Sequence, residues 1–241
     1  MENKVLYYSW FSDMDDRPEL VKNCMETWGK YLPGFKVVNM NQEFIESNNI
    51  KSPYLDKALE YKMYSHAADY LRFWLMYNKG GLYLDSDVEI LGDISDLFEL
   101  SIYIGREGHK SSVPDNLEAA ILYFRSPNNT ILSNLLHKYD NLDLISMTYK
   151  EFKLNTAPRM MKSVGFEVTS ISHPNLIHRF NNTWFDYDVW NKDELDFCLN
   201  KGWITKKVDN DSCTALIYCK VLSEIIHGRY KKSYFKVIPY E

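Results

Sequence analysis

Eight consecutive residues decide the fold: Gly80-Gly81-Leu82-Tyr83-Leu84-Asp85-Ser86-Asp87. The apolar middle predicts a short buried strand, and the two aspartates come where that strand ends. Residues two apart in an extended chain point to one side, and open α/β sheets bind ligands at the carboxyl ends of their strands. Two close carboxylates repel each other unless a cation lies between them. The spacing indicates Mg²⁺ or Mn²⁺ that bridges to a diphosphate; the alternative is two solvated aspartates in a turn.

A helix is expected directly before this strand. Residues 65–78 have the clearest helical pattern in the chain, and Lys79-Gly80-Gly81 ends it with glycine in the left-handed cap. Asp69 and Arg72 are three residues apart in this helix, and hence on one face. Two interpretations stay open. One is an ordinary helix salt bridge; the other is a site in which Arg72 binds phosphate or hydroxyl groups and Asp69 accepts from hydroxyls.

The flanking sequence predicts an α/β fold. Strands at residues 5–10 and 35–40 enclose a helix that begins at Pro18 and ends at Pro33-Gly34, which is typical of a parallel sheet with crossovers. We expect further strands at 88–91, 102–105 and 119–124, and helices at 128–139, 193–200 and 212–227. We therefore expect a main domain at residues 1–190 and a C-terminal helical extension, residues 191–241, packed on it.

Composition excludes several classes of protein. Of the 241 residues, 45% are hydrophobic and 25% charged, which is typical of soluble globular proteins and not of disordered or collagen-like chains. The net charge of −5 argues against a nucleic-acid partner. The four cysteines form no CxxC pair, which argues against a zinc site and favours a reducing compartment. With no apolar run of signal-peptide or membrane-spanning length, we expect a cytoplasmic protein.

The C-terminal end is basic. Residues 201–241 hold eight basic and four acidic side chains. A solvated basic tail is the favoured interpretation, and attraction to an anionic membrane surface or a lipid-diphosphate acceptor is the alternative. We therefore expect at most peripheral contact with the inner face of the membrane.

The central segments together resemble a known family. Residues 67–72 (Ala-Ala-Asp-Tyr-Leu-Arg) and 80–88 look like the core of glycosyltransferase family 32, whose DxD motif marks a sugar-binding region. That family includes capsular and O-antigen polysaccharide enzymes of bacteria, and the large clostridial glucosylating toxins share the signature. Trp10, within Tyr-Tyr-Ser-Trp-Phe, is similar to the family's N-terminal strand, and residues 176–184 are similar to its closing His … Ser-Trp segment.

The resemblance implies a GT-A fold: a Rossmann-like, nucleotide-sugar-binding α/β domain with a mixed, mostly parallel sheet and helices on both faces. It also implies Mn²⁺ or Mg²⁺ and retention at the anomeric carbon. By this resemblance Asp85 touches ribose and metal, Asp87 coordinates the metal directly, and His178 lies near the metal and the diphosphate. Thr183 and Trp184 would close over the leaving phosphate.

The resemblance also implies how the donor is held, with a UDP-sugar favoured over a GDP-sugar. Trp10 would stack on the base, while Asp69 and Arg72 would hold sugar hydroxyls. Tyr83 would line the nucleotide pocket or lie in the core. Arg72 and the two aspartates of the DxD motif form the expected catalytic set.

The chain departs from the family pattern at a few positions. The loop at residues 12–16 lacks the usual glycine, and Ala68 stands where serine is frequent. Glu118 stands where the family often has asparagine on the acceptor side. These departures bear on the identity of the donor and on the acceptor contacts, and leave the metal site in place.

The expected function is transfer of a hexosyl or N-acetylhexosaminyl group from a nucleotide sugar to a glycan or lipid-linked glycan in surface polysaccharide synthesis. No protein nucleophile or base is expected, because the departing phosphate can take the acceptor's proton. Two alternatives remain: a non-catalytic module that binds nucleotide sugars or glycans, and a metal-dependent phosphohydrolase.

Overall fold

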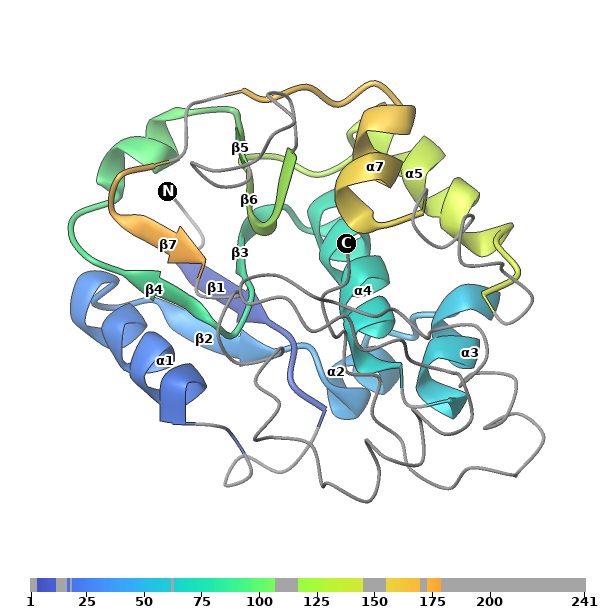
Figure 1. Cartoon of the computed structure of the whole chain (residues 1–241), viewed down its shortest axis with the longest axis horizontal. Helices are drawn as coiled ribbons and strands as arrows, with labels where there is room; N and C mark the ends of the chain where they lie inside the picture. The colour runs from blue at the N-terminus through green and yellow to red at the C-terminus, as the bar shows by residue number, and fades with distance from the viewer. Residues whose placement is uncertain are drawn as a thin grey trace, which may run out of the picture.

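The computed structural model describes residues 4–11, 17, 19–61, 63–106, 117–144, 155–169 and 173–178. Its centre is a five-stranded sheet with the order β2-β1-β3-β6-β5 (Figure 1). The strands are β1 (Val5–Tyr8), β2 (Lys36–Asn39), β3 (Gly81–Leu84), β5 (Ile102–Arg106) and β6 (Leu117–Phe124). β1 is parallel to β2 and β3, and β6 is antiparallel to both β3 and β5. β6 is therefore the one strand of this sheet that is reversed, which confirms the predicted mixed, mostly parallel sheet.

Helices cover both faces of this sheet, as predicted (Figure 1). On one face lies α1 (Glu19–Tyr31), whose buried Trp28 packs in one core with Leu82 and Leu84 of β3. The other face is covered by α3 (Pro53–Glu60), α4 (Tyr64–Asn78), α5 (Thr130–Asp140) and α7 (Ala157–Ser163). Tyr83 packs in that second core. Successive side chains of β3 thus enter opposite cores, as the two-residue period of a strand requires.

The turn from α4 into β3 depends on Gly80. Its φ is +67°, in the left-handed region, and its backbone N–H donates to the Leu75 carbonyl at 3.1 Å. A Cβ at this position would lie 2.8 Å from the carbonyl oxygen of Phe124 in β6. Glycine is therefore required both by the backbone conformation and by the close approach of the neighbouring strand. This confirms the predicted left-handed glycine cap.

A second, two-stranded sheet continues from the DxD segment. It pairs β4 (Val88–Ile90) with β7 (Leu176–His178) in antiparallel register, with His178 opposite Val88. Helix α1 supports β4: Trp28 Nε1 donates to the Val88 carbonyl at 2.8 Å, and Thr27 Oγ1 accepts from the Ile90 N–H at 2.9 Å. The residues that follow the two aspartates are thus held by α1 on one side and by β7 on the other.

The predicted elements that fall on described residues are present within a few residues of their expected ends. Shorter elements were not predicted: α2 (Gln42–Ser47), the 3-10 helix η2 (Ser95–Glu99), α7 and β7. The expected helices at 193–200 and 212–227, and with them the C-terminal extension, lie outside the described residues. Among the helices of the described part, none is long and apolar enough to cross a membrane.

Candidate functional site

The topology brings the N-terminal strand and the DxD segment to one edge of the sheet. From β1 the chain passes over one face through α1 to β2, and it returns over the other face through α4 to β3, on the opposite side of β1. Such a reversal between neighbouring parallel strands is where open α/β sheets bind ligands, outside the carboxyl ends of the strands. Trp10 follows β1 and Asp85 follows β3, so both lie at this edge.

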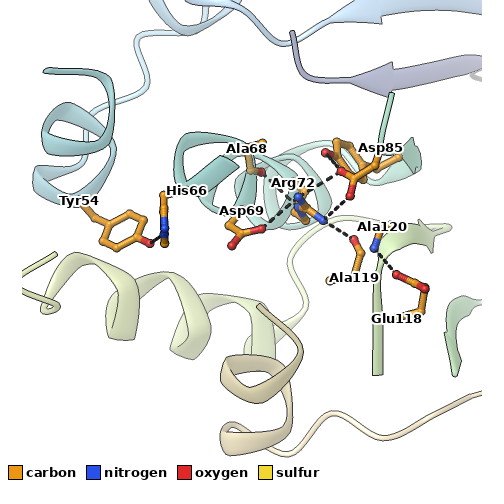
Figure 2. A network of polar contacts seen from close by, with 10 residues as sticks. Tyr54, His66, Ala68, Asp69, Arg72, Asp85, Glu118, Ala119 and Ala120 are labelled. Atoms are coloured by element: carbon orange, nitrogen blue, oxygen red, sulfur yellow. Dashed lines mark hydrogen bonds and ion pairs between the residues drawn. The ribbon is translucent and has the colours of Figure 1, made fainter. Parts of the chain in front are cut away.

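Arg72 is the centre of the polar cluster at this edge (Figure 2). Its guanidinium Nη2 lies 3.0 Å from Asp69 Oδ1 and 3.1 Å from Asp85 Oδ1. Nη1 donates to Asp85 Oδ2 at 3.3 Å and to the Ala119 carbonyl at 2.7 Å, and Nε donates to the Ala68 carbonyl at 3.3 Å. The helix salt bridge of the first interpretation therefore forms, and it lies beside the first aspartate of the DxD motif. The second interpretation, in which the two side chains bind a ligand, stays a prediction.

Tyr83 lies beneath this cluster. Its side chain is completely buried, and its ring centroid is 4.9 Å from Arg72 Cζ. Its hydroxyl donates to Asp85 Oδ1. Of the two positions that the sequence left open for Tyr83, the structure places it in the core and under the guanidinium, with its polar end on a site carboxylate.

The charges of the cluster act on one another. Burial raises the pKa of Asp69 to about 6, although Arg72 acts to lower it, and the charge of Asp85 raises it further. For Arg72, burial acts to lower the pKa, but Asp85, Tyr83 and Asp69 outweigh it, so the pKa rises above its ordinary value. Arg72 therefore stays positively charged at every physiological pH, whereas the charge of Asp69 depends on pH.

Asp87 lies in the turn between β3 and β4, directly before Val88, and it is only 6% exposed. The turn between the two aspartates is closed by the Val88 N–H, which donates to the Asp85 carbonyl at 3.0 Å. Since His178 pairs opposite Val88, its backbone lies next to this turn. The backbone of His178, which the resemblance places near the metal, thus lies beside the turn that carries Asp85 and Asp87. The side chain of His178 is outside the described part.

The donor set fits a hard divalent cation. Asp85 and Asp87 offer oxygen ligands only, which Mg²⁺ and Mn²⁺ prefer. Within the described ranges, no group of three His, Cys, Asp or Glu side chains lies close enough to hold a metal ion.

Trp10 is held by a residue that the sequence analysis missed. Asn39, the last residue of β2, accepts from the Trp10 N–H through Oδ1 at 2.8 Å and donates to the Trp10 carbonyl through Nδ2 at 2.9 Å. The side-chain amide thus imitates a strand neighbour and extends the β1–β2 ladder by one step. Trp10 itself is half-buried and packs against the core on the α1 face.

The start of β6 also contributes to the site, and of its residues the sequence analysis singled out only Glu118. Because β6 runs opposite to β3, its first residues lie at the carboxyl end of β3. There the Ala119 carbonyl accepts from Arg72, and the Ala120 carbonyl accepts from the Asp85 N–H at 2.8 Å. Glu118 Oε1 accepts from the Ala120 N–H at 2.8 Å, which places Glu118 near the cluster (Figure 2). Backbone carbonyls have no sequence signature, so these contacts could not be predicted.

A second buried polar pair joins α3 to the first turn of α4. The Tyr54 hydroxyl and His66 Nδ1 are hydrogen-bonded at 2.8 Å (Figure 2). Burial lowers the pKa of His66 to about 3, so this histidine is neutral and serves the core. The remaining predicted site residues, Thr183 and Trp184, lie outside the described residues.

Comparisons with known proteins find glycosyltransferases among the proteins that this chain resembles. The chain is 26% identical over 102 residues to an uncharacterized glycosyltransferase of Acanthamoeba polyphaga mimivirus, and the match spans 41% of each chain. The chain therefore covers less than half of the length of that curated relative.

Solved glycosyltransferases are similar at low identity. The PaToxG glycosyltransferase matches with 16% identity over 67% of each chain and a TM-score of 0.49. The glycosyltransferase GlyE of Streptococcus pneumoniae TIGR4 matches with 16% identity over 67% of this chain and 43% of its own, with a TM-score of 0.39.

The family model described as "Capsular polysaccharide synthesis protein" matches residues 1–153, a stretch that contains Trp10, Arg72 and both aspartates of the DxD motif. This stretch is more than half of the chain. The chain belongs to the capsular polysaccharide synthesis protein family.

Proposed function

We propose that the protein is a metal-dependent, retaining glycosyltransferase with a GT-A fold that moves a hexosyl or N-acetylhexosaminyl group from a nucleotide sugar to a glycan acceptor during synthesis of a capsular or O-antigen polysaccharide. The observation that carries the proposal is the cluster of Arg72, Asp69 and Asp85, followed by Asp87, at the carboxyl edge where β1 and β3 meet. Membership in the capsular family and the mimiviral relative support it.

In this proposal Asp87, Asp85 and His178 hold Mn²⁺ or Mg²⁺. When bound, that ion neutralises the negative charge that grows on the departing diphosphate. Asp87 binds the ion directly, and Asp85 contacts the ribose and the ion while it keeps its contacts to Arg72 and Tyr83. The site then brings three carboxylates and one guanidinium together, a net negative set that requires a cation before a diphosphate can bind.

The donor is a UDP-sugar in preference to a GDP-sugar. Trp10, fixed by Asn39 at the end of β1, stacks on the base. Asp69 uses Oδ1 for Arg72, so its other oxygen is the acceptor offered to a sugar hydroxyl. Thr183 and Trp184 close over the leaving phosphate. The acceptor attacks from the face that the diphosphate leaves, and a phosphate oxygen takes its proton, so the proposal assigns no side chain as a base.

The acceptor in this proposal is a glycan or a lipid-linked glycan at the inner face of the membrane. The basic residues of the C-terminal extension would provide peripheral contact with an anionic surface there. The proposed location is therefore cytoplasmic.

The test is turnover of UDP-sugars and GDP-sugars with Mn²⁺, with Mg²⁺ and with EDTA. We expect metal-dependent release of the nucleoside diphosphate, and we expect Asp87→Asn to reduce it by at least about a hundredfold because the ion loses a direct ligand. Asp93→Asn is the matched control. Asp93 is also a carboxylate near β4, but its oxygens accept from the backbone and hydroxyl of Ser95, away from the site.

Three results would contradict the proposal in different ways. Full activity of Asp87→Asn would refute the metal assignment. Binding of nucleotide sugars without transfer to any acceptor or to water would favour the non-catalytic binding module. Release of inorganic phosphate from simple esters would favour a metal-dependent phosphohydrolase.

A further inference from the structure

Each of the three nitrogens of the Arg72 guanidinium has a partner inside the protein. An arginine carries five N–H groups, and Arg72 makes five contacts: Nε with the Ala68 carbonyl, Nη1 with the Ala119 carbonyl and Asp85, and Nη2 with Asp69 and Asp85. These contacts span 2.7 to 3.3 Å. A sugar hydroxyl or a phosphate that bound Arg72 would have to compete with these contacts.

The exposed fractions of the three charged side chains also indicate that Arg72 faces the interior. The side chain of Arg72 is 7% exposed, whereas those of Asp69 and Asp85 are 20% and 23% exposed. Beneath the guanidinium lies the ring of Tyr83, which is completely buried. The surface that this cluster offers to a ligand is therefore made by the two carboxylates, and the cation and the aromatic ring lie behind them.

We propose that Arg72 is a positioning residue: it holds the carboxylates of Asp69 and Asp85 in place for the donor and does not contact the donor itself. Tyr83 has the same role toward Asp85, through its hydroxyl, and it supports the guanidinium from below. This inference rests on the proposed function. The resemblance implied that Arg72 holds sugar hydroxyls and that Tyr83 lines the nucleotide pocket or lies in the core; here both residues instead orient the carboxylates that bind the donor.

The physical reason is that the two carboxylates come from different elements and repel each other. Asp69 lies in α4, and Asp85 follows β3. A planar guanidinium can bind both at once, with a fixed angle between its N–H groups, and it cancels one of the two charges. Lysine would supply the charge as a single point and could not fix the orientation of both carboxylates. Groups that orient a ligand-binding carboxylate typically change affinity or activity by about 10- to 100-fold when they are mutated.

The experiment compares binding of UDP and of UDP-glucose by calorimetry in the presence of Mn²⁺, with the full chain. UDP lacks the sugar, so it separates contacts to the sugar from contacts to the nucleotide and metal. For Arg72→Lys we expect the affinity for UDP to fall about tenfold or more, and the affinity for UDP-glucose to fall by at least the same factor. Unchanged affinity for UDP, with weaker binding of UDP-glucose, would mean direct contact with the sugar and would overturn the proposal.

Tyr83→Phe separates positioning from a direct contact between Arg72 and a phosphate. It removes only a buried hydroxyl that cannot reach the donor, and it keeps the ring under Arg72. Positioning predicts that the affinity for UDP with Mn²⁺ falls about threefold or more, with the circular dichroism spectrum unchanged. Wild-type affinity of Tyr83→Phe would overturn the proposal, and this variant decides the question even where Arg72→Lys does not fold.

Arg125→Lys is the matched control. Arg125 is also held by backbone carbonyls, those of Phe98, Glu99 and Leu100, but it follows β6 at the opposite end of the sheet, next to the Phe124–Gly81 pair. We expect Arg125→Lys to bind UDP as the wild type does.

If the wild-type chain bound neither UDP nor GDP with Mn²⁺, the proposed function would fail and this inference with it. Binding by the wild type together with an unaffected Tyr83→Phe would remove this inference alone.

Discussion

Asp69 is a carboxyl group that the fold makes harder to ionise. Burial raises its pKa from the ordinary value of 3.8 to about 6, so the folded chain holds a proton here more tightly than the unfolded chain does. Between pH 4 and pH 6 protonation therefore favours the folded state, and this group's contribution to stability decreases as the pH rises through that window. The ion pair with Arg72 reduces the effect without reversing it.

Asp69→Asn tests the direction of this pH dependence, because asparagine cannot ionise and keeps an acceptor for Arg72. We expect the free energy of unfolding of the wild type, taken relative to that of the variant, to fall by about 1 to 3 kcal/mol between pH 4 and pH 7. The measurement is urea unfolding at several pH values in EDTA, so that no metal contributes. Curves that stay parallel over the whole range would contradict the raised pKa.

At the scale of single residues, the sequence predicted which side chains lie on one face better than it predicted their contacts with other elements. The spacing of Asp69 and Arg72 correctly predicts that they share a face of α4. It could not predict that Arg72 also reaches Asp85 and the Ala119 carbonyl, because those contacts depend on how α4 packs against β3 and β6. The amide of Asn39 on the Trp10 backbone was missed for the same reason.

At the scale of the element, long periodic segments were predictable and short ones were not. Helices α1, α4 and α5 run for three turns or more and show their apolar face in the sequence. Elements such as α2, with six residues, and β7, with three, are too short to show a period and form because their neighbours provide contacts. The turn before β3 was predictable, since its glycine has a local stereochemical cause.

Gly80→Ala is the mutation that tests this turn. A side chain at a φ of +67° costs about 1 to 2 kcal/mol, and the added Cβ also meets the Phe124 carbonyl at 2.8 Å. We expect the free energy of unfolding to fall by about 2 kcal/mol or more, measured by urea unfolding.

Gly29→Ala is the matched control for that variant. Gly29 lies inside α1, and a Cβ there meets nothing within 4 Å. Alanine is favoured over glycine in a helix by about 0.5 to 1 kcal/mol, so this variant should gain stability. Equal effects of the two alanines would mean that Gly80 has no special conformational role.

At the scale of the whole molecule, the sequence correctly predicted the α/β class, the mostly parallel sheet and the helices on both faces. The position of the reversed strand was not predictable, because strand direction depends on how distant segments meet. The proposed assignment to glycosyltransferase family 32 and the relation to clostridial toxins remain predictions, and so does the C-terminal extension.

A nucleotide that binds only the folded chain raises the stability of the whole molecule. At a concentration of one hundred times its Kd, UDP with Mn²⁺ should add about 2.7 kcal/mol, which corresponds to a rise in Tm of about 5 to 10 °C for a domain of this size. The measurement is thermal unfolding with UDP and Mn²⁺, with UDP and EDTA, and with Mn²⁺ alone. An equal rise in EDTA would show that the nucleotide binds without a metal.

The alternation of side chains along β3 has a consequence for how the gene can vary. Leu82 and Leu84 enter one core, while Tyr83 enters the other together with Arg72. Inserting or deleting a single codon between Gly81 and Asp85 would exchange the two sets and turn the first carboxylate away from its guanidinium. We therefore expect related chains to keep the number of residues between Gly81 and Asp85 more strictly than the identity of the apolar residues. Substitutions can persist in this stretch where insertions and deletions cannot.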